Sequence, residues 1–192
     1  MPPKVKITKK DIIDNALELV REGGAEALNA RSIARSLDCS TQPIFSNFES
    51  MEELEYSVLY AAFNKYLGFI SAEIESGKYP AYKASGMAYI RFAREERELF
   101  KYLFMCDRQG AELKPTEDFE VSVEMIMKAN GCSQEIARLI HLEMWVFVHG
   151  VATMLATSFW ELDEELVSRM LTDVYQGVRH KLLEEENANG SH

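Results

Sequence analysis

The chain has 192 residues, 47% hydrophobic and 27% charged, so it is long enough to bury a substantial core, and neither disorder nor a fibrous repeat is indicated. The formal net charge of −10 is unevenly spread. Residues 1–48 carry seven Lys or Arg against six Asp or Glu, whereas residues 49–192 carry 14 against 25. The total charge therefore does not exclude a nucleic-acid partner for the first segment.

Residue usage indicates an all-α protein. Proline and glycine are scarce, at five and ten residues, and no alternating β-branched run is followed by an Asn-Gly or Asp-Gly turn. Three cysteines, Cys39, Cys106 and Cys132, lack CxxC spacing, and the start of the chain lacks an apolar leader, so we expect a reduced, cytoplasmic protein. The cysteines are typical of helix packing, and a redox-sensing role for Cys106 or Cys132 is an alternative.

The first predicted helix begins after Thr8, with Asp11 placed to complete a capping box, and ends at Gly23-Gly24. Its apolar side chains form one continuous stripe: Ile12, Ile13, Ala16, Leu17 and Val20. Four lysines lie among the first ten residues, where they suit either phosphate contacts or a solvated basic tail. We expect this helix to brace the two short helices that follow.

Residues 29–48, NARSIARSLDCSTQPIFSNF, predict a helix, a tight turn and a second helix. Asn29 is placed to cap a helix over about 30–37, and Asp38 and Cys39 interrupt it before a helix over about 41–47, where Pro43 fits the first turn. Such a pair fits a helix-turn-helix, whose second helix enters the DNA major groove, or an ordinary helical corner. We expect Ile44, Phe45 and Phe48 to anchor the second helix, leaving four polar side chains outward: Thr41, Gln42, Ser46 and Asn47.

Residues 8–54 resemble the N-terminal domain of the tetracycline-repressor (TetR) family. The resemblance lies in the opening amphipathic helix, the IARSL segment, the Ser-led helix ending at Phe48 and the SMEEL segment at residues 50–54. It implies a three-helix DNA-binding domain at 1–48 and a larger regulatory and dimerisation domain at 49–192. The DNA-contacting residues that we predict are Lys6, Thr8, Asn29, Arg31, Ser40, Thr41, Gln42, Pro43, Phe45, Ser46 and Asn47.

Four positions depart from the family pattern. Phe45 stands where a tyrosine is usual, Ser46 and Asn47 where tyrosine or histidine is common, and Met51 where a lysine usually opens the fourth helix. Two hydroxyls and one cation that often meet phosphates are therefore absent. We expect DNA affinity to be lower, to depend more on Gln42 and Asn47, or to shift to the N-terminal lysines.

Five further helices follow up to residue 160. Ser50 and Glu53 predict a capping box for a long helix to about residue 76, Pro80 opens the next, and a short helix covers Leu99–Phe104. A polar loop at 106–115 precedes a helix from Thr116 to Asn130-Gly131, and Ser133 caps the next. This last helix has no Asp, Glu, Lys or Arg between Met144 and Trp160, a run too short and polar for a membrane span, so we expect it to be buried on two sides.

The final helix begins after Asp163 and repeats apolar residues with a helical period. Together with its predecessor it could form a four-helix bundle with a second copy, although packing within its own chain is an alternative. We predict that the dimer interface contains Val151, Met154, Leu155, Leu171, Val174 and Val178.

Residues 88–105 and the Trp145-x3-His149-Gly150 spacing resemble the regulatory domain of the TetR branch named for its Trp-His-Gly motif. A TetR-like regulatory domain implies a pocket, and aromatic and thioether side chains favour an apolar or aromatic small-molecule effector. The predicted pocket residues are Phe63, Tyr66, Tyr89, Phe92, Phe104, Met125, Trp145 and His149. For His149, a hydrogen-bonded core histidine is the alternative.

The sequence contains no Gly-rich phosphate loop, G-x-S-x-G or H-E-x-x-H motif, and His141 and His149 are too far apart along a helix to share a metal without a further ligand. We therefore expect no catalytic site, metal or cofactor. The predicted function is a homodimeric, ligand-responsive regulator that binds a palindromic operator in double-stranded DNA, as a repressor by resemblance. The alternative is an effector-binding helical dimer that has lost sequence-specific DNA binding.

Overall fold

The computed structural model describes residues 7–105 and 116–189, and all regular secondary structure in these ranges is helical. The elements are α1 (Lys9–Gly23), η1 (Ala25–Ala27), α2 (Ala30–Ser36), α3 (Gln42–Asn47), α4 (Met51–Glu75), α5 (Ala81–Glu95), α6 (Arg97–Phe104), α7 (Thr116–Asn130), α8 (Gln134–Ala156) and α9 (Glu164–Asn189). The predicted all-α class is confirmed, and the 3₁₀ turn η1 was not expected. The predicted loop at 106–115, with Cys106, lies outside the described residues.

The chain forms two compact units that divide it differently from the predicted boundary after residue 48. Unit 1 contains Met1–Gly68 and Glu95–Cys106, and unit 2 contains Phe69–Arg94 and Asp107–His192. Unit 1 thus includes the first part of α4 and all of α6. The physical reason lies in α6, because Leu99, Phe100 and Leu103 are buried and the helix packs against α1. The functional division at residue 48 stays a prediction.

In unit 1, the apolar stripe of α1 supplies the centre of the core. Ile12, Ala16 and Val20 are fully buried, whereas Ile13 and Leu17, on the edges of the stripe, are half-buried. α2 and α3 both pack against α1. Side chains from the other elements complete this core: Ile33, Ile44, Phe48, Leu54, Val58, Phe100 and Leu103.

A buried carboxylate ties three helices of unit 1 together. Glu96, just before α6, is only 6% exposed. Its carboxylate accepts a 2.6 Å hydrogen bond from the Arg21 Nε atom of α1 and lies 3.4 Å from the Lys65 Nζ atom of α4. The two cations compensate for the removal of this carboxylate from water.

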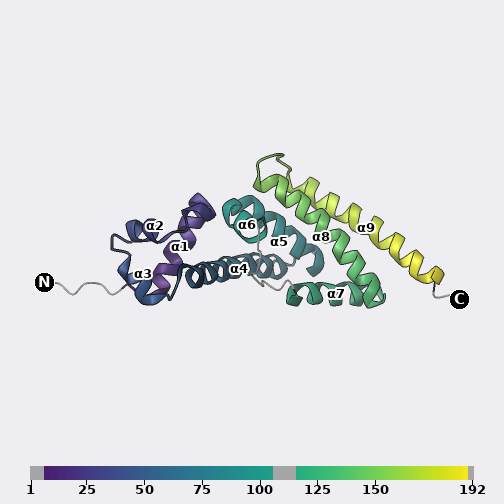
Figure 1. The fold of residues 1–192 in the computed structure, drawn as a ribbon. Coiled ribbons are helices and arrows are strands. Elements are labelled where there is room, and N and C mark those ends of the chain that lie inside the picture. Colours follow the sequence, from purple (N-terminus) through teal and green to yellow (C-terminus); the bar gives the residue numbers. More distant parts are fainter. Residues whose placement is uncertain (1–6, 106–115, 190–192) are drawn as a thin grey trace. The chain divides into compact units, whose positions relative to one another are not determined.

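Unit 2 is built around α8, which packs against both α7 and α9 (Figure 1). Apolar side chains of the three helices form one cluster: Val123, Ile126, Cys132, Ala137, Ile140, Met144 and Leu182. Tyr82 of α5 packs against this cluster, and its hydroxyl lies within hydrogen-bond distance, 3.0 Å, of the His141 Nδ1 atom of α8. Burial lowers the pKa of His141 and raises that of Tyr82, so both groups are neutral near pH 7.

α8 carries the long uncharged run that the sequence analysis singled out. Among the described residues, it is the one helix that is long and apolar enough to cross a membrane by length and composition alone. Only 39% of its most apolar window is buried within the chain. This is weak evidence for a membrane span, because a core helix passes the same test, and here α7 and α9 cover two sides of α8.

Candidate functional site

The turn between α2 and α3 is fixed by a helix-ending motif rather than by a glycine. The Cys39 amide donates to the Ala34 carbonyl at 2.9 Å, and the Asp38 amide donates to the Arg35 carbonyl at 3.2 Å. This pair of bonds is a Schellman motif, which requires one residue with positive φ. Asp38 adopts φ +49°, a conformation that aspartate tolerates better than most side chains. The turn places α3 on the core of unit 1.

The two faces of α3 differ sharply in burial. Ile44 and Phe48 are 1% and 2% exposed, as predicted, but Phe45 is 53% exposed. The prediction that Phe45 anchors the helix is therefore wrong. The physical reason is helical geometry, because consecutive residues lie 100° apart around the axis, so a side chain next to the buried Ile44 leaves the core face.

Two of the four side chains expected to face outward bond to their own helix. The Asn47 Nδ2 atom donates to the Pro43 carbonyl at 2.7 Å in a partly buried position, and the Ser46 hydroxyl donates to the Gln42 carbonyl at 2.8 Å. The expectation that the Asn47 amide is free is therefore corrected. Gln42 is exposed, and no hydrogen bond engages its side chain in the part of the chain that the structure describes. We call Gln42, Phe45 and Ser46 the recognition face, because their i, i+3, i+4 spacing puts them on one side of α3.

Thr8 and Asn29, both predicted to contact DNA, are helix caps. The Thr8 hydroxyl oxygen accepts from the Asp11 amide at 3.2 Å, and the Asp11 carboxylate accepts from the Thr8 amide at 2.8 Å. The Thr8 hydroxyl also donates to the Asp11 carboxylate at 2.7 Å, and the two bonds that the carboxylate accepts, from this hydroxyl and from the Thr8 amide, hold the pKa of Asp11 below its ordinary value. Asn29 Oδ1 accepts from the Ser32 amide at 2.9 Å. The predicted caps are confirmed, contact of either residue with DNA stays a prediction, and Lys6 lies outside the described residues.

Asn29→Ala is expected to lower the free energy of unfolding by about 1 kcal/mol, because the Ser32 amide loses its side-chain acceptor. Chemical denaturation measures this change. Asn29→Asp, which keeps a capping oxygen, is the matched control and should stay near the parent. An alanine variant as stable as the parent would show that water replaces the cap without cost.

α3 carries no cation, but α2 carries two exposed arginines. Arg31 and Arg35 are exposed on α2, one turn apart and therefore on the same side of the helix. Lys9 is engaged, since its Nζ atom lies 2.6 Å from the Glu53 carboxylate and 4.6 Å from the centre of the Phe48 ring. The site prediction did not include Arg35, although its i, i+4 spacing from Arg31 puts the two arginines on one side of α2.

The eight predicted pocket residues fall in both units. In unit 1, the Tyr66 ring lies 5.7 Å from the Phe63 ring and 5.3 Å from the Phe104 ring, so these three form one aromatic cluster. In unit 2, Phe92 is fully buried and Met125 is half-buried. The remaining three, Tyr89, Trp145 and His149, lie together.

His149 connects the aromatic side chains of α5 and α8. Its ring stacks on that of Trp145, with centres 5.3 Å apart and planes at 12°, and its Nδ1 atom is 2.9 Å from the Tyr89 hydroxyl. Burial lowers the pKa of His149, so the imidazole is neutral near pH 7. A hydrogen-bonded histidine was the alternative to a ligand-contacting role, and both remain compatible with this geometry.

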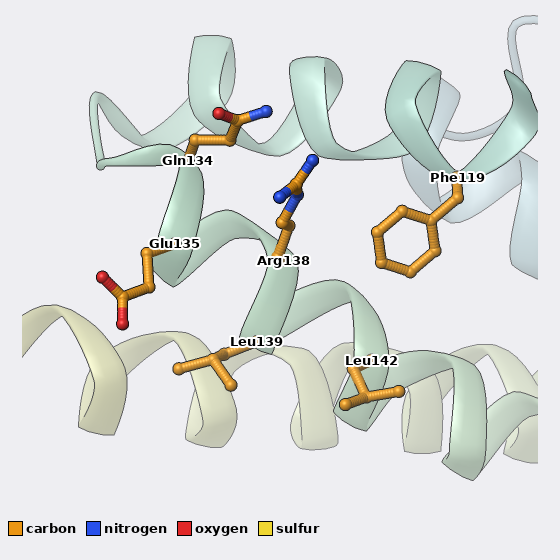
Figure 2. A pocket seen from close by; sticks show the side chains of 6 residues that line it. All are labelled: Phe119, Gln134, Glu135, Arg138, Leu139 and Leu142. Atoms are coloured by element: carbon orange, nitrogen blue, oxygen red, sulfur yellow. The ribbon is translucent and has the colours of Figure 1, made fainter. Parts of the chain in front are cut away.

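Two hollows occur in unit 2, and neither is lined by the predicted pocket residues. The larger, of about 350 Å³, is a groove between α7 and α8 (Figure 2), lined by Phe119, Gln134, Glu135, Arg138, Leu139 and Leu142. The smaller, of about 260 Å³, is lined by Glu73, Ser76, Lys78, Met87, Ile90, Arg91, Arg94, Glu164 and Val167. Its charged side chains pair with each other, since Arg91 contacts Glu73 at 2.6 Å and Lys78 contacts Glu164 at 2.5 Å.

The predicted interface residues differ in how much surface they offer to a second copy. Val151, Leu155 and Leu171 are buried in their own chain, Val174 and Val178 are half-buried, and Met154 is exposed. A different set of apolar side chains on α8 is exposed: Leu139, Leu142, Trp145 and Val146. Within residues 7–105 and 116–189, no group of three or more His, Cys, Asp or Glu side chains is arranged to hold a metal ion.

Comparison with known proteins supports the fold. No family model and no curated protein matches the chain. A solved structure from Streptomyces coelicolor A3, described as a member of the TetR family, matches with a TM-score of 0.64 and 16% identity, over 90% of this chain and 98% of that one. The chain therefore has a TetR-like fold, with an N-terminal helix-turn-helix and a helical C-terminal part. At this identity the likeness concerns the fold alone.

Proposed function

We propose that the protein is a DNA-binding, ligand-responsive transcriptional regulator, a repressor that acts as a homodimer in the cytoplasm and not as an enzyme. The observation that carries this proposal is the exposed recognition face of α3, held by a fixed turn on a buried core within a TetR-like fold. This face presents the exposed aromatic ring of Phe45 and the free amide of Gln42. Both groups suit contact with base edges in a major groove.

α2 supports the same function. In a helix-turn-helix the first helix of the pair crosses the DNA backbone. Arg31 and Arg35 are exposed on one side of α2, and guanidinium groups bind phosphates through paired hydrogen bonds. In this proposal α2 contacts phosphates, and α3, which has no charged residue, contacts bases.

A homodimer would use the exposed apolar side chains of α8. Leu142 and Val146, 49% and 60% exposed, are one turn apart and so lie on the same side of the helix. Contiguous apolar surface of this kind is typical of protein interfaces. Two-fold symmetry would place two recognition helices roughly 34–36 Å apart, so we expect a palindromic operator.

The effector proposal rests on the aromatic side chains of the predicted pocket. Tyr89, Trp145 and His149 present stacked rings and polar edges, which suits an apolar or aromatic small molecule. The Trp145-His149-Gly150 spacing supports the Trp-His-Gly branch as part of this proposal. An effector that binds better to the form unfit for DNA would release the operator, and by linkage the operator would weaken effector binding.

The test is a mobility shift with DNA from upstream of the chain's own gene, in competition with scrambled duplex. We expect selective retention that survives excess scrambled competitor. Equal competition by both duplexes at every salt concentration would overturn the proposal.

Replacing Arg31 and Arg35 together with alanine is expected to reduce the salt dependence of DNA binding. The slope of log K against log salt is negative, and each lost phosphate contact makes it less steep by about 0.9. The slope of the double variant should therefore be smaller in magnitude by roughly 1.8. Fluorescence anisotropy at several salt concentrations measures the slope. Arg169→Ala, at an exposed arginine of α9, is the control and should keep the parent slope. An unchanged slope in the double variant would remove α2 from the DNA contact.

The second candidate is a helical effector-binding dimer that has lost sequence-specific DNA binding. The observation that favours it is that α3 carries no cation, while Ser46 and Asn47 donate to carbonyls of their own helix. Non-specific binding that Gln42→Ala and Phe45→Ala leave unchanged would favour this candidate. A shift in site preference with either variant would favour the regulator.

A further inference from the structure

The Phe45 side chain is unusual for its position. It is 53% exposed, and within the described residues it makes no ring contact. α3 is anchored on the core by its neighbours Ile44 and Phe48, which are 1% and 2% exposed. The ring is therefore available to a partner that approaches the recognition face.

The neighbours of Phe45 restrict what that partner can be. Ser46 uses its hydroxyl proton on the Gln42 carbonyl at 2.8 Å, and Asn47 uses its amide on the Pro43 carbonyl at 2.7 Å. Gln42 keeps a free amide with two donor hydrogens and an acceptor oxygen. The recognition face thus presents one apolar ring and one bidentate amide.

These two groups match one kind of base pair. In the major groove, thymine is distinguished by its 5-methyl group, which apolar side chains contact, and adenine by an edge that glutamine binds with two hydrogen bonds. Guanine is most often bound by arginine or lysine, and α3 has neither. A phenol at position 45 would add a hydroxyl for phosphate, whereas phenylalanine offers only apolar surface.

We infer that Phe45 determines specificity by contacting the 5-methyl group of a thymine, with Gln42 reading an adenine close by. This inference rests on the proposed function. Each half of the operator then contains an A·T pair at a fixed position, where the methyl group rather than the pairing itself is recognised.

The experiment removes the methyl group without changing the base pair. Binding sites are first selected from a random duplex pool, and each thymine of the selected site is then replaced with deoxyuridine, symmetrically in both halves. At one thymine position per half we expect affinity to fall about sixteenfold, since each of the two buried methyl groups contributes roughly fourfold. The other thymines should tolerate the replacement.

Variants of the protein assign the effect to one side chain. In Phe45→Ala, thymine and deoxyuridine sites should bind equally well, whereas Phe45→Leu, which keeps apolar surface, should retain part of the difference. Tyr60→Ala removes a 58% exposed ring from α4 of the same unit and should keep the full difference. Circular dichroism checks that each variant is folded.

The outcomes separate the inference from the function beneath it. Two outcomes would overturn the inference but not the proposed function. In the first, the protein binds selectively and no deoxyuridine replacement changes its affinity. In the second, Phe45→Ala still distinguishes thymine from deoxyuridine. Failure to select any site from the pool would overturn the proposed function, and the inference with it.

Discussion

Phe100→Ala is expected to lower the free energy of unfolding of unit 1 by about 3–5 kcal/mol, the usual cost of truncating a buried phenylalanine. Phe100 lies on α6, far along the sequence from the helix-turn-helix, yet it is fully buried in the unit that contains α1, α2 and α3. Its ring also lies 5.3 Å from that of Phe104. Because α6 packs on α1, the cavity should weaken the support of the recognition helix.

The measurement combines chemical denaturation with amide hydrogen exchange over α1 and α3. Exchange in both helices should accelerate in Phe100→Ala. Phe159→Ala is the matched control, since that ring is 78% exposed and its loss should change stability by less than about 0.5 kcal/mol. If α1 kept its normal protection from hydrogen exchange in a destabilised Phe100→Ala variant, the predicted domain at residues 1–48 would be independent of α6. A domain boundary at residue 48 implies that result.

The double variant Leu142→Asp with Val146→Asp is expected to convert the proposed dimer to monomers at micromolar concentration. Two-fold symmetry makes each substitution count twice, so four apolar side chains would be replaced by four carboxylates. Each apolar side chain that is no longer buried in the interface costs about 1.5–3 kcal/mol of association free energy. In addition, charges of the same sign would face each other across the interface. The dissociation constant should rise by at least about 100-fold.

Analytical ultracentrifugation measures the change in assembly. Val121→Asp, at an exposed valine of α7, introduces the same charge on another helix and should leave the dimer unchanged. A double variant that sediments like the parent would move the interface away from Leu142 and Val146. A parent that is monomeric at every concentration would remove the proposed interface altogether.

Local signals predicted the ends of several helices well. Thr8, Asn29, Ser133 and Asp163 each accept a hydrogen bond from a backbone amide of the helix they were expected to begin. A cap depends on residues three apart in sequence, so tertiary structure has little opportunity to override it. Ser50 also accepts from the Glu53 amide, but the Glu53 carboxylate bonds to the Glu49 amide and to Lys9 instead of completing the capping box.

Tertiary packing set the features that local signals missed. The unit boundary depends on α6 meeting α1, a contact between distant segments that periodicity cannot reveal. Phe45 was assigned to the core because it is apolar, although it lies 100° around the helix axis from the buried Ile44 and is 53% exposed. Asn47 was assigned outward because it is polar, although an amide near a helix end readily bonds to the carbonyl four residues earlier.

The proposed effector site was the hardest feature to predict from the sequence. Aromatic residues at helical spacing fill both cores and pockets, and composition does not separate the two uses. Phe92 illustrates the problem, since it is fully buried and packs edge-on against Phe69, 5.3 Å away. The stacked pair of Trp145 and His149 could be predicted from its i, i+4 spacing. The hydrogen bond between His149 and Tyr89 could not, because the two residues are 60 positions apart on different helices.

The most direct test of the central claim, that two copies of the chain place two α3 helices on DNA, is a footprint on the selected site combined with the stoichiometry of the complex. We expect two protected half-sites, roughly 10 base pairs or a small multiple of that apart, with an even number of chains bound. Protection of a single half-site by one chain, or uniform protection without a boundary, would contradict the claim.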